Sequence, residues 1–292
     1  MKKLFVTGTL ILLLSMCFAC SGKGKSIENV EQIKDNRYSC TYDGVKHDFW
    51  LELPETAEGA PLVVMLHGYG DSGEGFRSTT HFERVANEKG MAVVYVNGAA
   101  NPNDTSSAKC WNAGLGIEGN DDVSFLKAFV KYLQKEYSLD ASKTYVIGFS
   151  NGAFMVHRLA MEANDTFSGF VSVAGKMPEN VWNSKNSKNN FKFLQITGEK
   201  DDVVPKKSDG SAAHAKDPAI EDVIDYYVSS NGLELSDTVE IGEGSVINKY
   251  SKEGSDNAVW HLFVKDARHS WYTEKVNGVD TNAVIIEFLT EE

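Results

Sequence analysis

The sequence GFSNG at residues 148–152 places Ser150 between two glycines, in the pattern G-x-S-x-G. A hydroxyl in this setting can attack a carbonyl carbon as a nucleophile, provided that a neighbouring base removes its proton. Because the chain holds 25 glycines among 292 residues, the pattern alone also arises by chance. The elements around Ser150 therefore decide between a nucleophile and a coincidence.

A strand and a helix are predicted to meet at Ser150. The apolar run TYVIGF leads directly into it. Apolar residues then recur at helical spacing, namely Ala153, Val156, Leu159, Ala160 and Ala163. A sharp strand-to-helix turn presents a serine at the end of a strand and requires small neighbours, which Gly148 and Gly152 supply. This context favours a nucleophile.

An acid and a base are predicted downstream of the nucleophile. In α/β-hydrolases the order along the chain is serine, acid, histidine, with the last two on loops after later strands. Asp201 follows the strand-like run FLQITG, and His269 follows the run VWHLFV. The spacing from Gly198 favours Asp201, and Asp202 stays the alternative acid, because pattern alone cannot order adjacent loop carboxylates. His214 lies in a polar stretch and His261 inside a predicted strand, so neither is well placed as the base.

An oxyanion hole is predicted from two backbone N–H groups. One belongs to Asn151, at the start of the helix that follows the nucleophile. The other belongs to Tyr69 in the loop HGYG, where Gly68 and Gly70 let the chain turn this amide inward. The alternative for this loop is an ordinary Gly-rich strand-to-helix turn. We expect His67 to be a hydrogen-bonded loop side chain and not a base.

The order of apolar runs predicts an α/β fold with a mostly parallel, doubly wound sheet. LVVML and MAVVYV read as buried strands, with the helix HFERVANEKG between them. DDVSFLKAFVKYLQKEY reads as a helix whose first turn is capped by Asp121 or Asp122. Before these units, YSCTYDGVKHDFWLEL reads as an antiparallel hairpin that turns at Asp43 and Gly44.

The N-terminus predicts export. Residues 1–19 combine Lys2 and Lys3 with a long uncharged stretch, which is typical of a signal peptide. Ala19 before Cys20 resembles a bacterial lipoprotein cleavage box, so Cys20 is expected to carry lipid on a periplasmic or cell-surface protein. The alternative is a plain secretory signal. Residues 20–36 then form a flexible tether, and residues 37–292 form a single domain.

Composition narrows the range of partners. The formal net charge is −12, which repels nucleic acid and favours a neutral ester or esterified oligosaccharide as substrate. Export permits a disulfide between Cys40 and Cys110, although two free thiols fit the sequence equally well. Neither C-x-x-C nor H-E-x-x-H occurs, so we expect no metal site and no cofactor. The sequence leaves the oligomeric state open.

Ordered motifs from Pro61 onward resemble the secreted esterases grouped with poly(3-hydroxybutyrate) depolymerases and feruloyl esterases. The similarity runs through PLVVMLHGYGDSG, WNAGLGIEGNDDVSFL, YVIGFSNGAFMVHRLA, FLQITGEKDDVVP, VIDYYVSSNGL, RHSWY and GVDTNAVIIEFL. It implies an α/β-hydrolase fold and ester hydrolysis through an acyl-enzyme. Carried over by position, it implies the catalytic residues Ser150, Asp201 and His269 and the oxyanion amides of Tyr69 and Asn151.

The chain departs from this family around the site. Many members carry a Cys after the HG of the oxyanion loop, where Tyr69 stands here, and further cysteines near WNAG, where Cys110 stands alone. Trp111, Trp182 and Trp271 are candidates for stacking on an aromatic acyl group or a sugar, with packing in the protein interior as the alternative.

These features predict a serine carboxylesterase for feruloyl esters of plant cell-wall polysaccharide. A polyester depolymerase and an acetyl esterase are alternatives within the same chemistry. A non-catalytic glycan-binding surface lipoprotein is the alternative of another class, since a fold does not prove a function.

Overall fold

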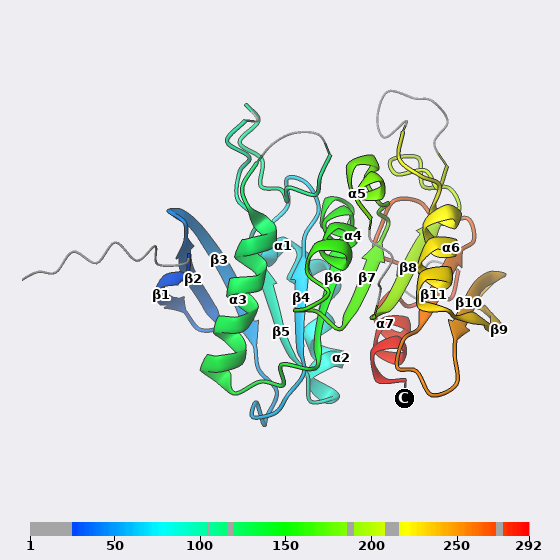
Figure 1. The fold of residues 1–292 in the computed structure, drawn as a ribbon. Helices are drawn as coiled ribbons and strands as arrows, with labels where there is room; N and C mark the ends of the chain where they lie inside the picture. The colour runs from blue at the N-terminus through cyan, green and yellow to red at the C-terminus, as the bar shows by residue number, and fades with distance from the viewer. Residues whose placement is uncertain are drawn as a thin grey trace, which may run out of the picture.

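One β-sheet runs through the chain in the computed structural model (Figure 1). The structure describes residues 25–103, 105–115, 119–185, 190–207, 216–272 and 277–291. The predicted signal peptide, Cys20 and His214 lie outside the described residues. The strands are β1 (Ile27–Lys34), β2 (Arg37–Tyr42), β3 (Val45–Glu52), β4 (Leu62–Leu66), β5 (Ala92–Val96), β6 (Thr144–Phe149), β7 (Gly169–Val173), β8 (Lys192–Gly198), β9 (Glu234–Ile241), β10 (Ser245–Ser251) and β11 (Val259–Val264).

Helices cover both faces of this sheet, as the doubly wound prediction requires. They are α1 (Gly73–Thr80), α2 (Phe82–Glu88), α3 (Asp122–Tyr137), α4 (Asn151–Glu162), α5 (Glu179–Asn183), α6 (Ile220–Asn231) and α7 (Thr281–Thr290). α3, α4 and α6 lie on one face and α1, α2 and α7 on the other (Figure 1). Buried side chains of the first group pack in one apolar cluster, and those of the second group pack in another. The α/β prediction is confirmed.

The centre of the sheet is parallel and both edges are antiparallel. The strand order is β1-β2-β3-β5-β4-β6-β7-β8-β11-β10-β9. The six strands from β5 to β11 in this order pair in parallel. Every residue of β4, β5 and β7 is buried, because helices cover both of their faces. The ribbon of β9 and β10 at the far edge was not predicted from the sequence.

The predicted N-terminal hairpin is present as β2 and β3, and it is larger than expected. Asp43 and Gly44 both adopt positive φ, as a tight two-residue turn requires. The prediction of a flexible tether over residues 20–36 is wrong for 27–34, which form β1 and pair antiparallel with β2. Ile27 and Val30 pack against the core, and this contact with the pairing to β2 explains the order of the segment.

Two smaller predictions are settled by the fold. Asp121 caps α3 by accepting a hydrogen bond from the backbone N–H of Ser124 at 3.1 Å, whereas Asp122 points into the protein. Cys40 and Cys110 are both buried and form no disulfide with each other. Within the described part of the chain, no helix combines the length and apolarity needed to span a bilayer.

The parallel strands bring four distant loops to one edge of the sheet. The loops after β4, β6, β8 and β11 all follow the carboxyl ends of parallel strands. These loops carry His67, Ser150, Asp201 and His269 in that order. Ligand sites of open α/β sheets form at this edge, so the topology gathers the predicted site residues.

Candidate active site

Ser150 occupies a strained turn between β6 and α4. Its backbone has φ 50° and ψ −117°, a conformation that residues other than glycine rarely adopt. A Cβ at Gly148 would overlap the carbonyl oxygen of Gly152, and a Cβ at Gly152 would overlap that of Leu66. Both glycines are therefore required by close backbone packing, and the turn has the geometry of a nucleophile elbow.

The structure selects one of the two candidate acids. The Oδ2 atom of Asp201 lies 2.8 Å from Nδ1 of His269, and its side chain is 1% exposed. Its Oδ1 accepts hydrogen bonds from the backbone N–H groups of Val203 and Val204 at 3.0 and 2.8 Å. Asp202 points into solvent with its side chain 71% exposed. Asp201 is thus the carboxylate fixed against the imidazole.

His269 lies beside the elbow that carries the serine. Its ring stands 5.1 Å, between centroids, from the ring of Phe149, the residue that precedes Ser150. The carboxylate of Asp201 accepts a hydrogen bond from Nδ1–H of His269, so Nε2 is left as the basic nitrogen. His269 keeps 14% of its side chain exposed. The imidazole is therefore oriented by protein and reachable from solvent.

The predicted oxyanion loop lies against the nucleophile. A Cβ built on Gly68 would stand 3.4 Å from Cβ of Ser150, so the loop of residues 67–70 borders the elbow. Gly70 has φ +74° and donates its N–H to the carbonyl of Lys109 at 2.8 Å. Asn151 is the first residue of the twelve-residue helix α4, where backbone N–H groups have no helical acceptor. The loop that carries the Tyr69 amide and the first residue of α4 thus both border the nucleophile.

His67 holds this loop in place as a neutral side chain. Its Nε2 accepts the N–H of Gly98 at 3.0 Å, and its Nδ1 donates to the carbonyl of Gly68 at 2.7 Å. The ring is fully buried, and burial lowers the pKa of His67 below its ordinary value. A neutral imidazole with both nitrogens engaged cannot act as the base, in agreement with the sequence analysis.

The structure places two of the three candidate tryptophans in the protein interior, which contradicts a direct contact with substrate for those two. Trp111 is 2% exposed and donates its indole N–H to the carbonyl of His67 at 3.1 Å. Trp271 is also buried and donates to Asn282. For Trp111 and Trp271 the alternative of interior packing is correct. Trp182 is half-buried and packs against Tyr226.

Trp111 has a structural role that was not predicted from the sequence. Its backbone N–H donates to Oδ1 of Asn151 at 2.7 Å, and its carbonyl accepts from Nδ2 of Asn151 at 3.2 Å. The next residue, Asn112, donates its N–H to Oδ2 of Asp122 at 2.7 Å. The segment before α3 thereby braces the residue after the nucleophile. The WNAG motif marked this segment in the sequence, and its role is visible only in three dimensions.

A second buried group ties the nucleophile helix to the strand before the acid. His157 of α4 donates from Nε2 to Oε1 of Gln195 in β8 at 3.2 Å. Its Nδ1 accepts from the hydroxyl of Tyr227 at 3.1 Å. Burial lowers the pKa of His157 to about 3, so the ring is neutral. These bonds fix the position of Ser150 relative to Asp201.

Neither the alternative base His261 nor a group of metal ligands is found at the site among the described residues. His261 lies within β11, and burial lowers its pKa to about 4. No group of three or more His, Cys, Asp or Glu side chains among the residues with described positions has the arrangement of a metal site. The candidate site thus consists of Ser150, His269, Asp201 and the neighbouring amides.

Several known proteins are similar to this chain in sequence. Residues 53–224 match the family described as Phospholipase/Carboxylesterase. The protein NocK of Nocardia uniformis subsp. tsuyamanensis is 35% identical over 168 residues, covering 57% of this chain and 47% of NocK. A bifunctional acetylxylan esterase/xylanase of Neocallimastix patriciarum is 25% identical over 162 residues, covering 55% of this chain and 22% of that protein. Relatives named feruloyl esterase and poly(3-hydroxyalkanoate) depolymerase also match.

Solved structures agree on the fold. The acetyl xylan esterase from Aspergillus awamori superposes with a TM-score of 0.60 at 14% identity, covering 83% of this chain and 93% of that one. At this identity the likeness bears on the fold alone. The chain spans less than half the length of the curated relatives described above. Because the family match covers more than half of this chain and includes its nucleophile elbow, the chain belongs to the phospholipase/carboxylesterase family of α/β-hydrolases.

Proposed function

We propose that the chain is a serine carboxylesterase that acts through an acyl-enzyme. The observation that carries the proposal is the contact of 2.8 Å between the buried Asp201 and His269, beside the strained turn of Ser150. A serine on such a turn, a histidine with its Nδ1 held by a carboxylate, and backbone amides nearby are the parts that acyl transfer requires.

In the proposed reaction, Nε2 of His269 takes the proton of Ser150 as its Oγ attacks the ester carbonyl. Asp201 stabilises the imidazolium that forms. The backbone N–H groups of Tyr69 and Asn151 hold the oxyanion, and one such donor contributes about 3 kcal/mol in enzymes of this kind. His269 then protonates the departing alcohol, and a water molecule activated by the same imidazole releases the acid.

We propose acetyl esters of plant cell-wall polysaccharide as the substrate, in place of the feruloyl esters expected from the sequence. An aromatic wall from Trp111 or Trp182 would have favoured a feruloyl group, and Trp111 is buried away from solvent, as is Trp271. Only Trp182 remains as a partly accessible ring, and it packs against Tyr226 and Lys185. Relatives named acetylxylan esterase support the smaller acyl group.

A panel of esters tests the substrate class. We expect kcat/KM to be highest for acetylated xylo-oligosaccharides, lower for methyl ferulate and lowest for a hydroxybutyrate oligomer. The Ser150→Ala variant is the control for hydrolysis that does not use the site. A preference for methyl ferulate of tenfold or more would restore the feruloyl assignment, and activity on none of these esters would reject the proposed function.

We further propose that the protein is exported and anchored by lipid on Cys20. The support is the sequence of residues 1–20, with its basic start, long uncharged stretch and terminal cysteine. Two or three acyl chains bury enough apolar surface to hold a protein on a membrane. Cys20→Ser should move the protein from the membrane fraction to the soluble fraction. Retention of that variant on membranes would reject the anchor.

A further inference from the structure

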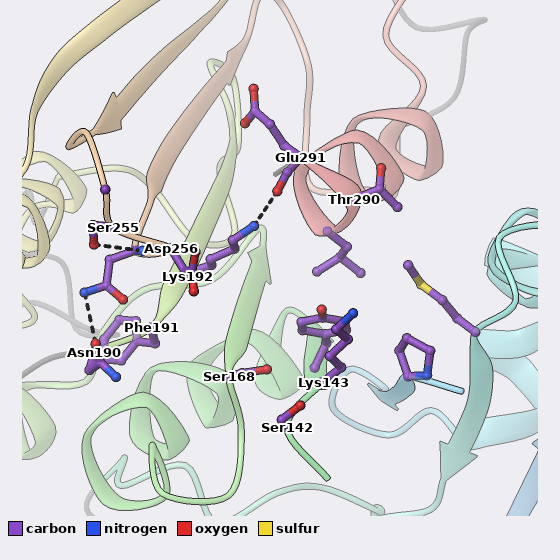
Figure 2. Close-up of a pocket in the computed structure, with 16 residues that line it drawn as sticks. Ser142, Lys143, Ser168, Asn190, Phe191, Lys192, Ser255, Asp256, Thr290 and Glu291 are labelled. Atoms are coloured by element: carbon purple, nitrogen blue, oxygen red, sulfur yellow. Dashed lines mark hydrogen bonds between the residues drawn. The ribbon is translucent and has the colours of Figure 1, made fainter. Parts of the chain in front are cut away.

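A recess lies at the end of the parallel sheet opposite to the catalytic loops. Its volume is about 950 Å³, within the range of small-molecule sites (Figure 2). Residues immediately before three parallel strands line it: Lys143 precedes β6, Ser168 precedes β7 and Phe191 precedes β8. The catalytic residues follow the other ends of these strands. The recess is therefore distinct from the site of Ser150.

Polar side chains in the recess have hydrogen-bond donors and acceptors that are available to a ligand. Nδ2 of Asn257 donates to Oδ1 of Asn190 at 3.2 Å, which leaves the Nδ2 donor of Asn190 and the Oδ1 acceptor of Asn257 available (Figure 2). Tyr145 also lines the recess, and its phenol can both donate and accept a hydrogen bond. These groups offer both donors and acceptors to one ligand.

The charges of the recess balance. Lys143 and Lys192 line it together with Asp256 and Glu291, and the Nζ of Lys192 donates to the carbonyl oxygen of Glu291 at 2.5 Å (Figure 2). An anionic ligand would meet the carboxylate of Asp256 and the net charge of −12 carried by the chain. A cationic ligand would meet Lys143. The recess thus favours a neutral ligand.

Apolar surface completes the lining. Pro61, Met91 and Leu289 contribute aliphatic groups beside the polar ones. A ligand that complements both the polar and the apolar lining carries many hydroxyl groups, with C–H groups between them. Each hydroxyl can donate one hydrogen bond and accept others, which suits the mixed donors and acceptors. Neutral sugars have this chemistry.

We infer that the recess binds a neutral oligosaccharide chain, as a second site separate from catalysis. The inference rests on the proposed function for its choice of a plant polysaccharide. A protein held on a long polymer by a second site meets its ester groups at a raised local concentration. The recess would therefore raise activity on polymeric substrate and leave activity on small soluble esters unchanged.

Titration calorimetry with unsubstituted xylohexaose tests the inference on the full chain, because this probe carries no ester and cannot be turned over. Wild type and Ser150→Ala should bind it with equal affinity. Tyr145→Phe, which keeps the packing and removes the hydroxyl, should weaken binding roughly three- to tenfold. Ser142→Trp, at an exposed position of the lining, should abolish it. Tyr132→Phe on α3 is the matched control and should bind like wild type.

Each result bears on the inference separately from the proposed function. No binding of xylohexaose at millimolar concentration, or binding that a phosphonate on Ser150 blocks and Tyr145→Phe leaves unchanged, overturns it. Tighter binding of a galacturonate hexamer than of xylohexaose rejects the neutral ligand. Hydrolysis of p-nitrophenyl acetate should be the same in wild type, Tyr145→Phe and Ser142→Trp. A wild-type protein that hydrolyses no ester but binds xylohexaose would reject the proposed esterase function and support the oligosaccharide site in the recess.

Discussion

Asn151 is bound through its side chain to both backbone polar groups of Trp111, at 2.7 Å to the N–H and 3.2 Å to the carbonyl. Asn151 also supplies a proposed oxyanion donor, so this contact orients the donor from outside the helix. A rigid donor stabilises the transition state because it needs no reorientation during the reaction. The side chain of Asn151 is therefore a positioning group, and its effect can be separated from that of its backbone amide.

Asn151→Ala should lower kcat about tenfold and change KM little, because the backbone N–H remains and only its support is lost. Steady-state kinetics on an acetyl ester measure kcat and KM separately. Asn180→Ala is the matched control, since Asn180 binds the carbonyl of Gly114 in the same segment from an exposed position. Equal losses in the two variants would mean that Asn151 supports only the segment and not the oxyanion hole.

Neighbouring aspartates offer a second comparison. Asp201→Asn should lower kcat by roughly 10³- to 10⁴-fold, because an amide at this position holds the wrong histidine tautomer. Asp202→Asn should stay within twofold of wild type, because the exposed carboxylate of Asp202 pairs with the exposed Arg268 at 3.5 Å and not with His269. Both variants should unfold at similar temperatures. The assignment fails if Asp202→Asn is the more damaging change.

The fold and the triad were largely predictable because their signals are local. Runs such as LVVML have the continuous apolar pattern of strands buried on both faces, and the order of these runs fixes the order of the site loops. The spacing from Gly198 favours Asp201, but the final choice between Asp201 and Asp202 could not be made from the sequence. It depends on which carboxylate the turn after β8 directs inward, where Val203 and Val204 donate to it.

Other features could not be predicted from the sequence because they depend on tertiary contacts. Strand β1 has only Ile27 and Val30 packed against the core, so its sequence reads as polar chain, and its order comes from pairing with β2. The burial of Trp111 depends on its contacts with His67 and Asn151, which are 44 and 40 residues away along the chain. No local pattern separates such a tryptophan from one that faces a substrate.

Gly148 should tolerate no side chain. In Gly148→Ala the new methyl group would overlap the carbonyl of Gly152, and relief requires a shift of the elbow backbone. We expect a loss of about 3 kcal/mol in the free energy of unfolding and a large loss of activity. Urea unfolding measures the first quantity. Gly68→Ala is the matched control, because its methyl group would make an ordinary contact of 3.4 Å with Ser150 and should leave stability nearly unchanged.

His261 should make the protein sensitive to acid. Burial lowers its pKa to about 4 in the folded chain, and the nearby Lys206 acts in the same direction while Glu221 opposes it. Since the unfolded chain has the ordinary pKa of 6.5, it binds more protons between these values, and stability is lost as pH falls from about 6.5 to 4.

His261→Leu should therefore unfold less readily than wild type at pH 4.5, by up to about 3 kcal/mol, and much like wild type at pH 8. The buried Nε2 of His261 has no hydrogen-bond partner among the described residues, so its removal leaves no polar group orphaned. Thermal unfolding at the two pH values checks the difference. A variant that is destabilised equally at both would assign His261 a packing role alone.

Covalent labelling by a serine-directed phosphonate tests the central claim most directly. The phosphonate reacts only with a serine that a neighbouring base activates. Peptide mapping by mass spectrometry should find one label per chain, on Ser150, and hydrolysis of an acetyl ester should fall in proportion to labelling. Asp201→Asn should label far more slowly than wild type. A folded protein that does not react, that reacts at another serine, or that stays active when Ser150 is fully labelled would contradict the account.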